Sequence, residues 1–142
     1  RFIIAKLYEA SAAGVEIDLI VRGICVLRPG LKDVSENIRV RSIVGRFLEH
    51  SRIFCFYNGG KEDVFLSSAD WMPRNLNNRI ELMTPVRKKA HKKRLLALLA
   101  TYLADNTRAW LMQPDGSYRR VHRAKGEKSR AVQEELMKRK FL

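Results

Sequence analysis

The chain has 142 residues, 46% hydrophobic and 30% charged, a length and composition that suit one globular domain with a single core. No apolar run approaches the roughly 20 residues of a membrane-spanning helix, and two cysteines with three scattered histidines lack zinc-site spacing. The formal net charge of +13 indicates an anionic partner: nucleic acid, an acidic surface or a polyphosphate.

The positive charge is unevenly distributed. Residues 1–84 carry 12 Lys and Arg against 10 Asp and Glu, whereas residues 85–142 carry 16 against 5. Nine of the twelve cations in the first part are arginine, whose planar guanidinium binds phosphate oxygens through two hydrogen bonds. The pattern indicates a specific phosphate site beside a general basic surface, and composition alone leaves a nucleic-acid binder open.

The predicted elements are typical of an α/β domain. In chain order they are a helix at 2–13, strands at 15–21 and 38–44, paired strands at 53–57 and 64–67, an extended run at 79–86, a helix at 89–104, a hairpin of 109–112 with 118–122, and a helix at 127–140. We expect a mixed β-sheet of about five to seven strands flanked by helices. Ligands of α/β sheets bind at the carboxyl ends of strands, so Arg22, just after the first strand, is a candidate ligand contact.

Two cysteines, Cys25 and Cys55, lie in or beside apolar strand-like runs, and we expect both to be buried thiols in a reducing cytoplasm. The chain opens at Arg1, in a helical pattern without a methionine or signal peptide, which suggests a fragment of a larger protein.

His50 begins the most informative motif of the chain. Arg52 follows two residues later, and a strand pair then leads to Ser67-Ser68-Ala69-Asp70-Trp71. Residues two apart in a strand face the same side, so His50 and Arg52 can point at one phosphate. The motif resembles the phospholipase D-like pattern, in which H-x-K precedes a strand pair that closes on G-S-x-N.

The departures from that pattern also carry information. Arg52 stands in place of lysine, Asp70 in place of asparagine, and no acid occupies the position of the motif aspartate. These differences argue against a self-sufficient hydrolase and favour a relative that binds and transfers phosphoryl groups. We expect Asp70 and Trp71 to close the strand end, and Arg39 and Arg41 to form a solvated stripe, with a channel lining as the second interpretation.

Longer strings resemble the bacterial polyphosphate kinase family. They are Ile17–Cys25, Leu27–Gly30, Ser35–Arg52 and Ser67–Leu76. The resemblance implies a kinase that reversibly transfers the terminal phosphate of ATP to polyphosphate through a phosphohistidine. It also implies two tandem phospholipase D-like domains, of which residues 1–142 form the second as a single domain.

The resemblance assigns roles to two residues of this chain. Arg22 and His50 match residues that contact ATP phosphates, whereas the phosphorylated histidine, the magnesium-binding arginines and a tyrosine that contacts ATP lie in the preceding domain. We expect Mg²⁺ there and no metal ligand in this chain. Arg22 is predicted to act as a permanently charged clamp, and His50 as the catalytic group that donates a proton to a phosphate oxygen and takes it back. Spacing makes Arg52 a second phosphate clamp.

The expected partners are ATP, ADP, inorganic polyphosphate and the remaining domains of the same enzyme, with no dedicated nucleic-acid partner. We expect a homo-oligomeric full-length protein in the cytoplasm, with peripheral membrane association as an alternative, and an inactive isolated domain. Two other functions stay open. A basic nucleic-acid-binding module predicts exposed aromatic residues on a basic face, and a phospholipase D-like phosphodiesterase predicts turnover by the isolated chain.

Overall fold

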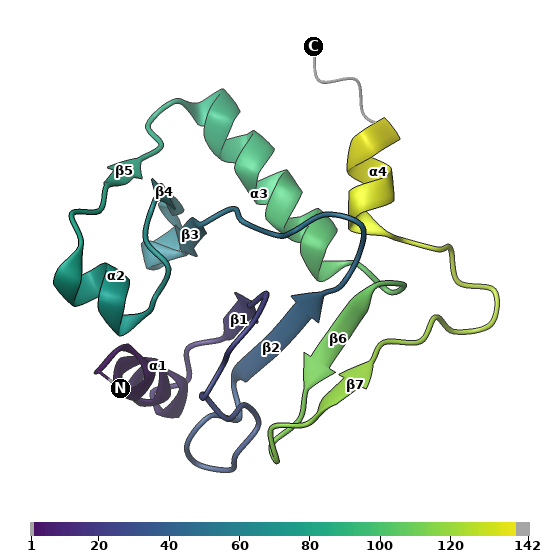
Figure 1. Cartoon of the computed structure of the whole chain (residues 1–142), viewed down its shortest axis with the longest axis horizontal. Helices are drawn as coiled ribbons and strands as arrows, with labels where there is room; N and C mark the ends of the chain where they lie inside the picture. The colour runs from purple at the N-terminus through teal and green to yellow at the C-terminus, as the bar shows by residue number, and fades with distance from the viewer. Residues whose placement is uncertain (1, 139–142) are drawn as a thin grey trace. The chain divides into compact units, whose positions relative to one another are not determined.

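The computed structural model describes residues 2–138, and the chain divides into two compact units (Figure 1). The first unit comprises Arg1–Glu49 and Tyr102–Leu142, and the second comprises His50–Thr101. That residues 1–142 form a single domain of a longer protein stays a prediction.

The first unit is built on a four-stranded mixed sheet in the order β1-β2-β6-β7. Its elements are α1 (Phe2–Ala12), β1 (Ile17–Ile20), β2 (Ile38–Ile43), β6 (Ala109–Met112), β7 (Tyr118–Arg120) and α4 (Val132–Lys138). β1 and β2 pair in parallel, and the other two pairs are antiparallel. Gly14 ends α1 with a φ of 88°, a conformation that glycine adopts without steric strain.

Two apolar clusters form the core of the first unit. Leu27, Ile38, Val40 and Met112 are buried, and the apolar side chains of α1 pack against them. Ile43, Ala109 and Val132 form the second cluster, which joins the ends of β2 and β6 to α4. Each fully buried aliphatic side chain contributes about 1.5–3 kcal/mol to folding, so the burial of these residues holds both helices on the sheet.

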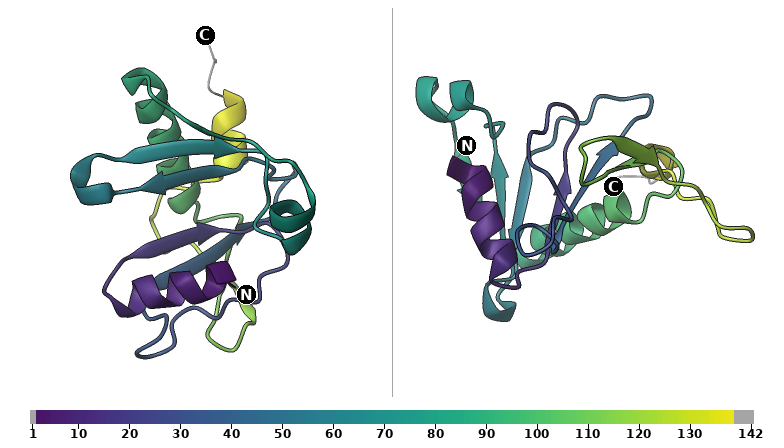
Figure 2. Two further views of the ribbon diagram at one scale, coloured as in Figure 1. Left: turned by 90° about the vertical axis from the view of Figure 1, so that its left-hand side faces the viewer. Right: turned by 90° about the horizontal axis from the view of Figure 1, so that it is seen from below.

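The second unit contains a three-stranded antiparallel sheet in the order β3-β4-β5. Its elements are β3 (Ile53–Phe56), the 3₁₀ turn Asn58–Gly60, β4 (Asp63–Ser67), α2 (Pro73–Asn78), β5 (Met83–Pro85) and most of α3 (Lys89–Leu103). Figure 2 shows β3 and β4 as a hairpin. Ile53 lies opposite Leu66 in this hairpin, so the residues just before β3 meet the residues just after β4.

The α/β class with a mixed sheet flanked by helices is confirmed, but the seven strands of residues 2–138 fall into two sheets.

Helix α2 was not predicted, although Pro73 at its first turn is a start signal. Helix α4 begins at Val132 and not at 127, because Oδ2 of the distant Asp105 accepts the Val132 N–H. Residues 121–131 form an extended loop (Figure 2), and predicted helical residues 139–140 lie outside the described residues.

Candidate phosphate-binding site

His50 and Arg52, which the spacing predicts to point at one phosphate, are in direct contact with each other. Nη1 of Arg52 lies 3.1 Å from Nδ1 of His50, and Nη2 lies 3.2 Å from Nε2. A guanidinium carries several N–H donors in one plane, so its two terminal nitrogens can contact both ring nitrogens of one imidazole. Arg52 therefore approaches His50 through both terminal nitrogens, and His50 itself is exposed.

Asp70 fixes the orientation of Arg52. Its Oδ1 accepts a hydrogen bond from Nε of Arg52 at 2.9 Å, and this interaction raises the pKa of the guanidinium. The Ser67 N–H donates to the Arg52 carbonyl at 3.0 Å and extends the β3–β4 pairing by one step. Arg52 is thus a permanent cation whose backbone and side chain are both held.

The residues that follow β4 are fixed by protein contacts. Ser67 Oγ accepts the Ala69 N–H at 3.1 Å, and Trp71 stacks on Phe54 with ring centroids 5.1 Å apart. Asp70 and Trp71 therefore close the strand end, as expected. This arrangement holds the Arg52–Asp70 pair on a rigid hairpin.

Glu81 is a residue that the sequence did not single out. Ser68 Oγ and Asn75 Nδ2 both donate to its carboxylate, the second at 2.7 Å, and these bonds hold the pKa of Glu81 below its usual range. Ser68 Oγ also accepts the Leu82 N–H at 2.9 Å. The contacts join residues 68, 75 and 81, which no local sequence pattern links.

Arg22 lies just past the carboxyl end of β1, as predicted. Its Nη1 donates to the Glu49 carbonyl at 3.2 Å. Glu49 ends the first unit and directly precedes His50 in the chain. Arg52 thus contacts His50 within the second unit, and Arg22 binds the backbone of Glu49 within the first unit.

Arg39 and Arg41 do not behave as one solvated stripe. Arg39 is exposed and pairs with Asp18 at 2.8 Å and Glu16 at 2.6 Å. Arg41 is half-buried, which lowers the pKa of its guanidinium, and its Nη1 donates to the carbonyls of Tyr102 and Asp105. Arg39 fits the expected solvated role, whereas Arg41 supports the fold.

Both cysteines are free thiols, but Cys25 is only half-buried and Cys55 is exposed, so the prediction that both are buried is wrong. Residues 2–138 contain no cluster of three or more His, Cys, Asp or Glu side chains that could hold a metal ion. Across the same residues, no helix combines the length and apolar character needed to cross a membrane.

Residues 1–133 match the family described as polyphosphate kinase C-terminal domain 2. The chain belongs to this family. Polyphosphate kinases of Neisseria gonorrhoeae and Synechocystis are 60% and 56% identical over 135 and 131 residues, which cover 94% and 92% of this chain but 20% and 18% of those proteins. The crystal structure of polyphosphate kinase from Porphyromonas gingivalis matches with a TM-score of 0.91 and 48% identity, over 96% of this chain and 21% of that one.

These similarities confirm the resemblance to polyphosphate kinase and, with it, the phospholipase D-like fold class. The chain spans about a fifth of the length of the polyphosphate kinases it matches.

Proposed function

We propose that this chain is the C-terminal catalytic part of a polyphosphate kinase that reversibly transfers the terminal phosphate of ATP to inorganic polyphosphate. In this proposal, Arg22, His50 and Arg52 bind the phosphates of ATP or ADP. The observation that supports it most strongly is the contact of His50 with Arg52, which Asp70 holds, in a chain of this family.

The proposed chemistry follows from the charge of a transferring phosphoryl group. Negative charge spreads over its oxygens, so catalysis depends on fixed cations and on positioning. Arg22 and Arg52 supply cations that do not deprotonate. His50 is exposed, and its imidazole can donate a proton to a phosphate oxygen and take it back.

The phosphorylated histidine, the Mg²⁺ site and the homo-oligomer are proposed to depend on parts of the protein outside this chain. The proposed roles of Arg22, His50 and Arg52 are binding phosphate oxygens and moving a proton. This division also predicts that the isolated chain has little or no kinase activity.

The test is ATP-dependent polyphosphate synthesis by the full-length protein with single substitutions. Arg22→Ala and His50→Ala are each expected to lower kcat/KM for ATP at least about 100-fold, because each removes a group that stabilises phosphate charge. His91→Ala, which changes an exposed histidine on α3, is the matched control and should stay within about twofold. Normal synthesis by the His50 variant would overturn the site assignment.

The family match favours the kinase over a nucleic-acid-binding module. Phe54 stacks on Trp71 and Phe56 packs edge-to-face on Phe65 at 6.1 Å, but Phe56, Tyr57 and Trp71 stay exposed, so the aromatic residues alone do not separate the two functions. A binding assay that shows tighter, salt-dependent binding of single-stranded DNA than of polyphosphate would reverse this choice. Hydrolysis of a phosphodiester by the isolated chain would instead support the phosphodiesterase.

A further inference from the structure

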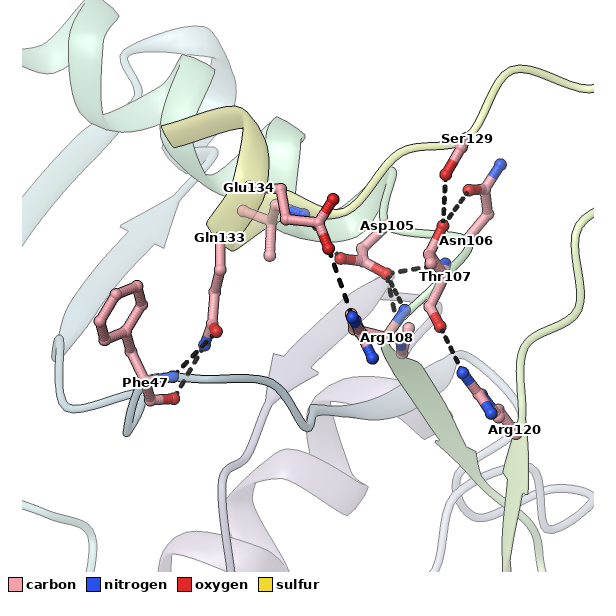
Figure 3. Close-up of polar contacts among 11 residues, drawn as sticks. Phe47, Asp105, Asn106, Thr107, Arg108, Arg120, Ser129, Gln133 and Glu134 are labelled. Carbon is pink, nitrogen blue, oxygen red and sulfur yellow. Dashed lines mark hydrogen bonds and ion pairs between the residues drawn. The ribbon is translucent and has the colours of Figure 1, made fainter. Parts of the chain in front are cut away.

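Gln133 connects helix α4 to the loop that precedes His50. Its side chain is only 6% exposed, and its amide faces the backbone of Phe47 (Figure 3). Oε1 accepts the Phe47 N–H at 3.0 Å, and Nε2 donates to the Phe47 carbonyl at 2.8 Å. Nε2 also donates to Oε1 of Glu49 at 2.6 Å. One buried amide thus holds two residues that lie 84 and 86 positions earlier.

Glu49 is held through both carboxylate oxygens. Gln133 binds Oε1, and the Tyr102 hydroxyl donates to Oε2 at 2.5 Å. Burial, together with this bond to Glu49, raises the pKa of Tyr102, so the phenol stays a donor throughout the neutral range. With its side chain fixed in this way, Glu49 presents its carbonyl oxygen to Nη1 of Arg22.

Gly45 provides the space for the Gln133 amide. A Cβ atom on Gly45 would lie 2.4 Å from Oε1 of Gln133, which is far inside van der Waals contact. The φ angle of Gly45 lies outside the left-handed region, so alanine is acceptable to the backbone there. A methyl group at this position would therefore have to displace the Gln133 amide from its hydrogen bonds.

Asp105 fixes the start of the helix that carries Gln133. Its buried carboxylate accepts the Val132 N–H at 2.8 Å through Oδ2, and Oδ1 accepts three N–H groups from residues 107–109 (Figure 3). The start of α4 is thereby fixed to the start of β6. Gln133 follows Val132 directly, so its placement does not depend on the exposed loop 121–130.

We propose that Gln133 is a positioning residue of the phosphate site, which fixes Glu49 and through its carbonyl orients Arg22. This inference rests on the proposed function, in which Arg22 binds phosphate. Without the amide, Phe47 and Glu49 turn to water for hydrogen bonds and Arg22 loses its fixed acceptor. Arg22 then spends less time in the conformation that binds phosphate, which raises KM for ATP.

The test uses the full-length protein with Gln133→Met, which keeps side-chain volume but removes the amide. We expect KM for ATP to rise about tenfold and kcat to change less, because Arg22 is still present but less well oriented. Glu134→Gln is the matched control, since its neighbouring side chain on α4 pairs only with exposed Arg108 among the described contacts. The control should stay within about twofold.

Two double variants separate positioning from a structural role. In the Arg22→Ala background, Gln133→Met should cause no further rise in KM, because its effect acts through Arg22. Gly45→Ala should raise KM in the wild-type background but not beside Gln133→Ala, where no amide remains to collide with the added methyl. Circular dichroism melting identifies variants that fail to fold, and Gly45→Ala tests the inference if Gln133→Met is one of them.

The outcomes distinguish the two levels of the hypothesis. A normal KM in Arg22→Ala overturns the proposed site itself. An impaired Arg22→Ala together with a normal Gln133→Met, or with effects that multiply independently, overturns the positioning role alone.

Discussion

Nε of Arg52 donates to Oδ1 of Asp70 at 2.9 Å, while the terminal nitrogens of the same guanidinium lie 3.1 and 3.2 Å from the ring nitrogens of His50. Arg52 and Asp70 are two of the three departures from the phospholipase D-like pattern, arginine for lysine and aspartate for asparagine. Their contact gives both departures one physical explanation. A guanidinium has an Nε–H to satisfy, and a carboxylate satisfies it better than an amide does.

Asp70→Asn is expected to destabilise the protein by about 1–2 kcal/mol. The side chains of the pair are 19% and 24% exposed, so its loss lies between that of a surface pair and a buried one. Arg52→Lys should have a similar cost. The double variant should be destabilised by less than the sum of the two single variants, because lysine has no Nε–H for the Asp70 carboxylate to accept. Urea denaturation of the four proteins measures this coupling, and strictly additive effects would contradict it.

Glu81 should contribute to acid sensitivity. Hydrogen bonds from Ser68 and Asn75 lower its pKa in the folded protein. A carboxyl group with a depressed folded pKa stabilises the fold above its unfolded value of about 4.3, and this contribution is lost as pH falls further. We expect Glu81→Gln to reduce the difference between urea midpoints at pH 6 and pH 3.5. An unchanged difference would show that other carboxylates dominate.

Tyr102 should make the folded protein less stable at alkaline pH. Its pKa is raised by burial and by the bond to Glu49, so the folded state holds the proton that the unfolded chain releases near pH 10. Stability therefore falls as pH rises above about 10. Tyr102→Phe should cost about 1 kcal/mol at pH 7 and weaken this alkaline loss. Thermal melts at pH 7 and pH 10.5 provide the comparison, and equal alkaline losses in both proteins would exclude the assignment.

Asp105→Asn is expected to destabilise the first unit by about 2–3 kcal/mol. The substituted amide can still accept at Oδ1, but its NH₂ group then faces the Val132 N–H, two donors with no acceptor between them. Exposed Asp115, which accepts from Ser117 in the β6–β7 turn, offers a matched control in Asp115→Asn. Guanidinium unfolding should place the control within about 1 kcal/mol of wild type. Equal losses in the two variants would count against this role of Asp105.

The sequence predicted those features that depend on neighbouring residues. The β3–β4 hairpin and helix α3 follow from the local pattern of apolar residues and the Gly59-Gly60 turn. That His50 and Arg52 bind one phosphate stays a prediction. Arg22 was found because its strand ends two residues earlier. The family resemblance then supplied what spacing alone left open, the identity of the phosphate ligand.

Long-range polar contacts were not predictable in this way. Gln133 reaches Phe47 across 86 positions, and Asp105 sets the first residue of α4 across 27. From the sequence alone, Gln133 and Asp105 have the polar character typical of surface residues. The local pattern also cannot assign the seven strands of residues 2–138 to two sheets. Strand pairing depends on contacts between segments that are far apart in the sequence.

The bond between Glu49 and Tyr102 has a consequence for how this chain can be engineered. Glu49 is the last residue of the first unit before residues 50–101, and Tyr102 is the first after them. Their side chains meet at 2.5 Å, so the chain leaves and re-enters the first unit at one place. Residues 50–101 are thus a contiguous unit whose flanking residues are joined by a side-chain hydrogen bond, and a glycine linker from 49 to 102 is a design to test. Such a miniature would carry Arg22 without His50 and would separate the contributions of the two residues to nucleotide binding.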